Sequence, residues 1–411
     1  TLMLHLGVTS LTRWLNHLAS DDLLAFLIGC SPSSLPPLGS YFDFIDSLWL
    51  RNPAFERLGR KDLFPAHKNL KPSKKPSKGE KLPNRHSGIT EIIATQAVSR
   101  KEFPFHYEKL LQELFRLTAL LPSLHAGLIP SDGLVLSGDG TCVHTHSFPY
   151  GHKVCSCSEN GIRVCSCPRH YSDPDAAWGW DSDLNCFYFG HTLYMLSSHN
   201  DRYCVDLPLH FHFFDARRHD SVSGIVSLKE FRALNPDIPV RDLCLDSAHD
   251  NYPTYQLCKT WEIRPFIDLN SKSGRPKSIP DFIRIDPDGT PVCQAGYRMG
   301  YVNGDVLWHE KGKKLFLPGF LLILPYGRCI YTKPEWDIRL YTPVPRGTTE
   351  YKNIYKNRTS CERVNDRVLN DYQLHNMKIH TKKRYSFFLW LIGTNIHLDA
   401  QLKKLRLQAT A

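Results

Sequence analysis

The spacing of apolar residues predicts helices in the first part of the chain. Residues 1 to about 66 are expected to be helical, with Ser20-Asp-Asp providing an N-cap and early negative charge for one helix. A second apolar helix is expected at about 42–50. Further along, apolar residues recur at spacings of four, three and four, which predicts an amphipathic helix that ends at Pro122 and packs its stripe into the core. The stripe consists of Leu110, Leu114, Leu117 and Leu121.

From residue 134 the pattern changes to that of β-strands. Three stretches rich in β-branched and aromatic residues are bounded by polar turns, and three strands in succession predict an antiparallel meander. They are 134–143, 186–197 and 203–214. A helix, a short buried strand, a second helix and a last strand are then expected, which extends the same sheet in parallel. These elements are 228–234, 240–245, 253–261 and 266–269. The predicted class is therefore α/β, with a mixed sheet flanked by helices.

Between these regions, residues 71–85 carry three prolines and six basic residues against one Glu, with no apolar periodicity. This composition is typical of a linker. Lys74 and Lys75 are candidates for contact with DNA phosphates, because each neutralised phosphate releases counterions. A solvated tether is the other interpretation.

Charge and composition restrict the partners only weakly. Lys and Arg outnumber Asp and Glu by 51 to 41, giving a formal charge of +10 that favours encounters with polyanions such as nucleic acid. The longest apolar run near either end, 387–392, is far shorter than a membrane span, and residues 1–30 lack the apolar core of a secretory signal. A cytoplasmic protein is expected, in which the thirteen cysteines are free or bound to metal.

Two aspartates stand where predicted strands end. Asp139 lies in Ser-Gly-Asp-Gly-Thr, where two glycines permit close approach of another group, and Asp246 directly follows the apolar strand 240–245. A carboxylate at such a place needs a hydrogen bond, an ion pair or a metal, although either residue could be an ordinary turn aspartate. Asp250 is an alternative ligand and otherwise an N-cap or a supporting partner.

The most specific motif is Tyr355, Arg358 and Glu362, whose spacings of three and four place them on one face of a helix. A surface ion pair between Arg358 and Glu362 would explain the spacing without any function.

These residues resemble the Tyr-x2-Arg-x3-Glu signature of bacterial insertion-sequence DDE transposases, the cut-and-paste group. Four further segments are similar to the family in the same order, and the resemblance covers about 134–400. The matching segments are 138–141, 189–196, 206–221 and 246–252.

The resemblance implies an RNase H-like core in which Asp139, Asp246 and Glu362 hold two Mg²⁺ or Mn²⁺ ions. Hard carboxylate oxygens suit these ions, which activate the attacking oxygen and stabilise the leaving one. Tyr355 and Arg358 would contact DNA phosphate. The expected activity is strand cleavage at terminal inverted repeats followed by strand transfer, carried out near the nucleoid by a homodimer that pairs two DNA ends.

The implied organisation has four parts. They are a helical N-terminal DNA-binding region at 1–70, a basic linker at 71–90, a helical lead-in at 91–130, and a catalytic core at 131–400 with inserts at 144–183 and about 270–345.

Two departures from the family pattern leave other functions open. The signature usually continues with a Lys seven residues after the Glu, where this chain has Leu369; Arg363 or Arg367 would have to supply that charge at the DNA. The segment 302–324 also lacks the cysteines found in relatives. The alternatives are a catalytically impaired, transposase-derived DNA-binding protein and an RNase H-like nuclease without strand transfer.

A cysteine-rich segment lies between the first two predicted core strands. Two Cys-x-Cys units across a seven-residue gap could form a hairpin that offers zinc four thiolates. Free thiols in a surface hairpin are an equally good interpretation, because the spacing is tighter than the usual Cys-x2-Cys unit. The four residues are Cys155, Cys157, Cys165 and Cys167.

Overall fold

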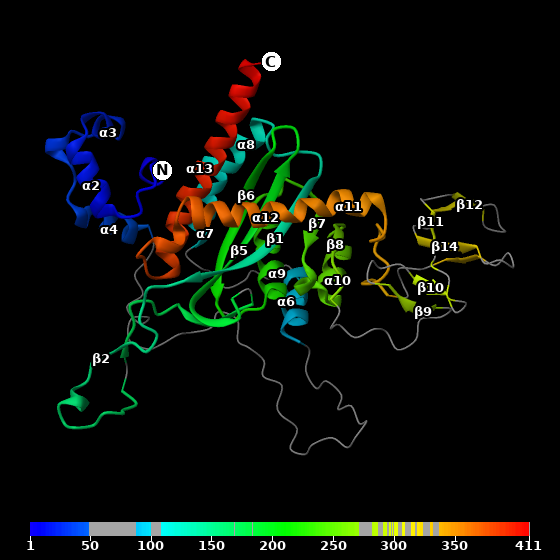
Figure 1. The fold of residues 1–411 in the computed structure, drawn as a ribbon, viewed down its shortest axis with the longest axis horizontal. Coiled ribbons are helices and arrows are strands. Elements are labelled where there is room, and N and C mark those ends of the chain that lie inside the picture. The colour runs from blue at the N-terminus through cyan, green and yellow to red at the C-terminus, as the bar shows by residue number, and fades with distance from the viewer. Residues whose placement is uncertain are drawn as a thin grey trace.

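The computed structural model describes residues 1–48, 88–99, 108–167, 169–182, 184–270 and 337–410, together with short strands between 282 and 331 (Figure 1). Lys74 and Lys75, with the rest of the predicted linker up to residue 87, lie outside the described residues, as do the side chains of 302–324.

A mixed sheet forms the centre of the protein (Figure 1). Strand β5 lies between β6 and β1 and is antiparallel to both, and β1 continues in parallel to β7 and then β8. Strand β4 pairs with the first residues of β5. The strands are β1 (Leu134–His144), β4 (Ala177–Asp181), β5 (Cys186–Asn200), β6 (Val205–Asp215), β7 (Val240–Leu245) and β8 (Arg264–Ile267). The predicted α/β class, the antiparallel meander and its parallel extension are confirmed.

Helices cover both faces of this sheet. Side chains alternate between faces along a strand. On β1, Ser137 contacts Ser197, whose hydroxyl donates to Ser360 of α12 (Thr359–Asp366), whereas Gly140 lies against Asp220 at the start of α9 (Asp220–Leu234). Helices α12 and α9 therefore lie on opposite faces. Further helices are α6 (Ile89–Val98), α10 (Tyr252–Thr260), α11 (Thr349–Tyr355) and α13 (Lys382–Ala409).

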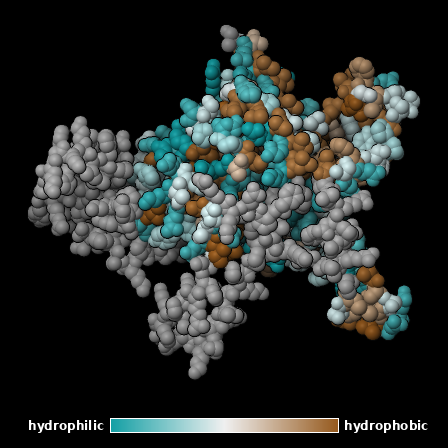
Figure 2. Space-filling model, turned by 180° about the vertical axis from the view of Figure 1, so that it is seen from behind, coloured by the Kyte–Doolittle hydropathy of each residue, from teal (hydrophilic) through white to brown (hydrophobic). Residues whose placement is uncertain are grey.

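The first 48 residues form short helices, as predicted. Asp21 caps α3 by accepting a hydrogen bond from the Leu24 amide at 3.0 Å. Met3, Leu4, Trp14 and Leu18 join the main core, whereas apolar side chains of α3 remain at the surface (Figure 2). The helices are α1 (Leu2–His5), α2 (Leu11–Ser20), α3 (Asp22–Leu27) and α4 (Leu38–Ser47).

The predicted leucine stripe is wrong at two of its four positions, although Leu114 packs against the core, and the predicted end of its helix is wrong. Leu110 and Leu117 are 45% and 57% exposed. The buried face lies beside them and consists of Leu111, Phe115, Ala119 and Leu120. Two overlapping apolar stripes exist in this sequence, and Phe115 packs against Phe211 of β6, with ring centroids 5.2 Å apart, which selects the second stripe.

The helix also does not stop at Pro122. Helix α7 (Glu108–Phe115) passes through a π-helical turn at Arg116–Leu120 into α8 (Leu121–His125). Pro122, which has no N–H to donate, lies just after this π-helical turn as the second residue of α8.

Small strand pairs lie outside the main sheet. A two-stranded hairpin joins β2 (His152–Lys153) to β3 (Arg169–His170) and projects from the body of the protein (Figure 1). Between residues 282 and 331, short strands pair antiparallel: β9 (Phe282–Ile285), β10 (Pro291–Cys293), β11 (Gly300–Val302), β12 (Val306–Trp308), β13 (Lys314–Phe316), β14 (Gly319–Ile323) and β15 (Cys329–Tyr331). Among the helices described, none is long and apolar enough to cross a membrane.

Candidate functional site

Asp139 and Asp246 lie near each other, beside the carboxyl end of β7. Ser137 of β1 is paired with Cys244 of β7 in parallel register. Each aspartate lies two residues beyond that pair, Asp139 within β1 and Asp246 directly after the end of β7, and neighbouring strands are about 4.8 Å apart. The parallel pairing of β1 with β7 is how residues 107 positions apart in the chain (246 minus 139) become neighbours.

The Asp139 carboxyl group lies in an electrostatically unfavourable place. Burial raises its pKa from 3.8 to about 7, and the neighbouring carboxylates of Asp220 and Asp246 act in the same direction. His249 and Arg358 oppose this rise only in part. Near pH 7 a group in this position is only partly ionised, and an approaching positive charge would favour its ionised form.

Asp220 is a third carboxyl group at this site, and the sequence analysis missed it as a site residue. It is the first residue of α9, and its carboxylate occupies the space where a Cβ on Gly140 would lie. Burial raises the pKa of Asp220, and Asp246 acts in the same direction while His249 opposes it. The glycines around Asp139 were the available signal, since they indicated close approach of another group; which group approached was not visible in the sequence.

Asp246 is held by a chain of hydrogen bonds. Its Oδ1 accepts from the Ala248 amide at 3.1 Å and lies 2.6 Å from His249 Nδ1, and His249 Nε2 lies 2.9 Å from the Tyr194 hydroxyl. Burial raises the pKa of Asp246, but the His249 contacts outweigh it and hold the pKa below its usual range. His249 correspondingly has a raised pKa, because its bond to Asp246 outweighs burial. This carboxylate is therefore oriented and charged, unlike Asp139.

The signature residues lie across the same strands. Ile354, at the end of α11, accepts a hydrogen bond from the Cys244 thiol of β7, and the Cys361 thiol of α12 lies 3.1 Å from the Ser137 carbonyl of β1. A 3₁₀ turn at Lys356–Arg358 separates the two helices. Arg358 is thereby placed close enough to Asp139 to influence its pKa.

Glu362 lies on the helix over β1, but its carboxylate is turned to Arg358. The Arg358 Nη2 donates to Glu362 Oε1 at 2.5 Å, and the Glu362 side chain is 47% exposed. Among the described residues, Asp139, Asp246 and Glu362 do not form a group with three ligand atoms within 4.8 Å of one another. The structure thus brings the two aspartates together and links Glu362 to them through Arg358.

The other predicted DNA-contacting residues that the structure describes are engaged within the protein. Arg363 forms two hydrogen bonds to Asp206 of β6, at 2.6 and 2.7 Å, and Arg367 donates to Asp399 of α13 at 3.0 Å. Tyr355 is half-buried, and burial together with its hydrogen bond to Asp268 raises its pKa. Leu369, at the position where the family has a Lys, is buried in the main core. A lysine there would be excluded from solvent.

Asp250 supports the fold. Its side chain is fully buried and accepts from Arg339 Nη1 at 2.7 Å, from the Asn270 amide at 2.7 Å and from the Tyr255 hydroxyl at 3.2 Å. The N-cap of α10 is Asn251 instead. Asp250 therefore ties the segment after β8 to the segment around Arg339.

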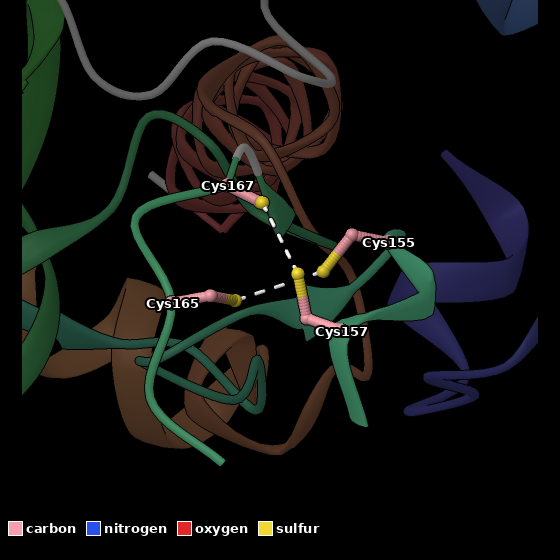
Figure 3. A group of neighbouring side chains, drawn as sticks. All are labelled: Cys155, Cys157, Cys165 and Cys167. Carbon is pink, nitrogen blue, oxygen red and sulfur yellow. Dashed lines mark hydrogen bonds between the residues drawn. The ribbon is translucent and has the colours of Figure 1, made fainter. Parts of the chain in front are cut away.

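Two clusters among the described residues bring three or more ligand atoms within 4.8 Å and could hold a metal ion. One is the group of four cysteines on the β2–β3 hairpin, whose side chains point toward one another (Figure 3). The other is on β6 and α9, where a Glu230 carboxylate oxygen lies 3.2 Å from His210 and 2.9 Å from His212.

Comparison with models of known protein families finds no match, and a search of curated proteins finds no significant relative. Fold and site define the class: an α/β protein with a mixed sheet, helices on both faces, and a cluster of acidic side chains where β1, β7 and α9 meet.

Proposed function

We propose that the protein is a DDE transposase with an RNase H-like catalytic core. The sheet supports this, because an antiparallel meander extended by two parallel strands is the arrangement that the family resemblance implies. The single observation that carries the proposal is the proximity of Asp139 on β1 to Asp246 directly after β7, with the 3₁₀ turn that ends at Arg358 and the helix that bears Glu362 lying across these strands.

The donor set suits magnesium or manganese. Carboxylate oxygens are the ligands that these ions prefer, and Asp139 with its raised pKa needs nearby positive charge. Asp139, Asp246 and Glu362 would hold the metal. When bound, it supplies Lewis acidity at the attacking and leaving oxygens of a phosphodiester. His249 and the Ala248 amide orient the Asp246 carboxylate for this role.

Glu362 must leave Arg358 before it can join the aspartates. A DNA phosphate offers the guanidinium an alternative bidentate partner, so DNA arriving at Arg358 would release the Glu362 carboxylate toward the site. Substrate binding and completion of the triad are coupled in this scheme. The partner is DNA, at element ends and target, and a homodimer would hold two ends together.

The test is strand cleavage of DNA carrying the element ends, with Mg²⁺ or Mn²⁺. Asp139→Asn, Asp246→Asn and Glu362→Gln are each expected to lower cleavage at least about 1000-fold, because each removes a charged ligand from a site that works by charge stabilisation, while DNA binding in a gel-shift assay stays nearly intact. Asp132→Asn, an exposed aspartate in the loop before β1, is the matched control. Cleavage at the unmodified rate in any of the three variants removes that residue from the triad.

Two observations favour a second candidate, a transposase-derived protein that binds DNA without cutting it. Glu362 is paired with Arg358 rather than grouped with the aspartates, and Leu369 is buried where a phosphate-binding lysine is expected. Metal-dependent cleavage by the unmodified protein excludes this candidate. Products joined to target DNA then distinguish a transposase from a nuclease that cuts without strand transfer.

A further inference from the structure

The β2–β3 hairpin gathers four cysteine side chains from two Cys-x-Cys units. The Cys155 and Cys165 sulfurs are 3.6 Å apart, the Cys157 and Cys167 sulfurs are also 3.6 Å apart, and all four lie within 4.8 Å of one another (Figure 3). The four thiols therefore converge on one point. None of them is joined in a disulfide.

These distances match a metal-centred tetrahedron. Zinc–sulfur bonds of about 2.3 Å at tetrahedral angles place neighbouring sulfurs about 3.8 Å apart. Two disulfides would instead require two pairs at about 2.05 Å. Four unligated thiols have no reason to converge, since a thiol is a weak hydrogen-bond donor and acceptor.

The hairpin has little else to hold it together. Among its described residues, two pairs form the β2–β3 ladder, His152 with His170 and Lys153 with Arg169. Side-chain hydrogen bonds from Lys153 to the Arg163 carbonyl and from Arg169 to the Tyr150 carbonyl add to them. Its apolar side chains are on the outside (Figure 2): Val154, Ile162 and Val164 are exposed, the last at 89%. A segment that buries so little apolar surface needs a cross-link to keep one conformation.

Charge on the hairpin also suits a metal thiolate. Four thiolates around a divalent ion carry a net charge of −2, because binding releases four protons from the thiols. Residues 151–170 contain Lys153, Arg163 and Arg169 against the single acid Glu159, a formal +2 without the histidines. The two charges cancel.

We propose that Cys155, Cys157, Cys165 and Cys167 bind one zinc ion, and that this ion holds residues 151–170 in the folded hairpin. Four protein ligands leave no open position, so the ion is structural and does no chemistry. The proposal does not depend on the transposase function, and it holds for a protein that only binds DNA.

The first experiment measures metal in the full-length protein purified without chelator. We expect about one zinc per chain, and a loss of at least tenfold in Cys157→Ser and in Cys165→Ser. Cys186→Ser and Cys204→Ser, which alter exposed cysteines outside the cluster, serve as matched controls and should keep their zinc. Zinc content that is unchanged in Cys157→Ser would overturn the proposal, and so would iron with acid-labile sulfide in place of zinc.

The second experiment uses the unmodified protein, so that a variant failing to fold cannot obscure the result. Zinc is removed with a chelator under reducing conditions and replaced by Co²⁺. Four-thiolate ligation predicts strong visible absorption of a tetrahedral ion together with a sulfur-to-cobalt charge-transfer band. Amide hydrogen exchange should rise at least tenfold at 151–170 on zinc removal and stay unchanged at β5. Absence of the cobalt bands, or unaltered exchange in the hairpin, contradicts the proposal.

Discussion

Asp139 makes an unfavourable contribution to the stability of the metal-free protein, and its sign follows from the pKa. In the folded state the pKa is raised to about 7, above the ordinary 3.8 that applies when the chain is unfolded. Between these values the folded state binds the extra proton, so stability falls as pH rises from about 4 and the full cost is reached above about 7. Without metal, the charged Asp139 carboxylate therefore destabilises the folded protein.

Asp139→Asn should therefore stabilise the metal-free protein while it abolishes cleavage. In EDTA at pH 8 we expect a gain on the order of 2 kcal/mol in the free energy of unfolding, because the amide keeps the acceptor for the Gly140 N–H at 2.9 Å and removes the buried charge. Urea denaturation of the variant and the unmodified protein at pH 5 and pH 8 measures this gain in the free energy of unfolding.

The gain should shrink at pH 5, where Asp139 is already protonated in the folded protein. Asp132→Asn should change stability by less than about 0.5 kcal/mol at either pH. A destabilised Asp139→Asn variant at pH 8 would show that the carboxylate is compensated by groups other than metal.

At the scale of elements, the site depends on how closely α9 and β5 approach β1. A Cβ on Gly138 would meet the Tyr194 hydroxyl of β5 at 2.7 Å, and one on Gly140 would overlap the Asp220 carboxylate of α9. Gly224 of α9 is equally close to the Tyr194 hydroxyl, at 2.7 Å. The missing side chains at Gly138, Gly140 and Gly224 therefore leave room for the Tyr194 hydroxyl and the Asp220 carboxylate between the sheet and α9.

Gly140→Ala should destabilise the protein by about 1–3 kcal/mol, because the added methyl group must displace Asp220 from a packed position. Adding Asp220→Ala should recover part of the loss, giving a coupling energy of about 1 kcal/mol or more in a double-mutant cycle. Chemical denaturation of the unmodified protein, the two single variants and the double variant measures this coupling energy.

Gly39→Ala is the control for the backbone effect, because nothing lies within 4 Å of a Cβ there and the residue is helical; it should be neutral or stabilising. If the stability change of the double variant equals the sum of the changes in Gly140→Ala and Asp220→Ala to within about 0.4 kcal/mol, the two residues do not compete for space.

For the whole molecule, the acidic site is a local exception on a basic protein. The formal charge is +10, yet the carboxyl groups of Asp139, Asp220 and Asp246 lie close enough together for Asp220 and Asp246 to raise the pKa of Asp139. Under the proposed function, the net positive charge would attract DNA without regard to its sequence, and the acidic site would accept a phosphodiester only when cations are present.

Binding to non-specific duplex DNA should accordingly weaken steeply with salt. Neutralising even two phosphates predicts about a tenfold loss of affinity between 50 and 200 mM monovalent salt, measured by fluorescence anisotropy without divalent metal. Asp139→Asn should leave the slope unchanged, because the aspartates make no salt-dependent phosphate contact. Affinity independent of salt over this range would contradict a DNA-binding role for the net charge.

Local pattern was sufficient for most elements of the fold. The bounds of β7, 240–245, agree residue for residue with the prediction, and β1, β5 and α10 agree within a few residues. The reason is physical: side-chain alternation and turn residues act over a few positions, so the information lies in the local sequence. Asp246 at the end of β7 was visible for the same reason. Asp139, predicted at a strand end, lies in the middle of β1, and the parallel pairing of β1 with β7 brings the two aspartates near each other.

Long-range packing determined the remaining features of the fold and the site, which local sequence patterns cannot specify. Packing of Phe115 against Phe211 determines which apolar face of its helix is buried. Asp220 lies at the site because α9 packs against Gly140. Arg363 and Arg367 donate hydrogen bonds to Asp206 and Asp399. Each depends on a partner from 32 to 157 positions away. Spacing within one helix shows which residues share a face, but the partner opposite that face belongs to another part of the chain and comes into place only on folding.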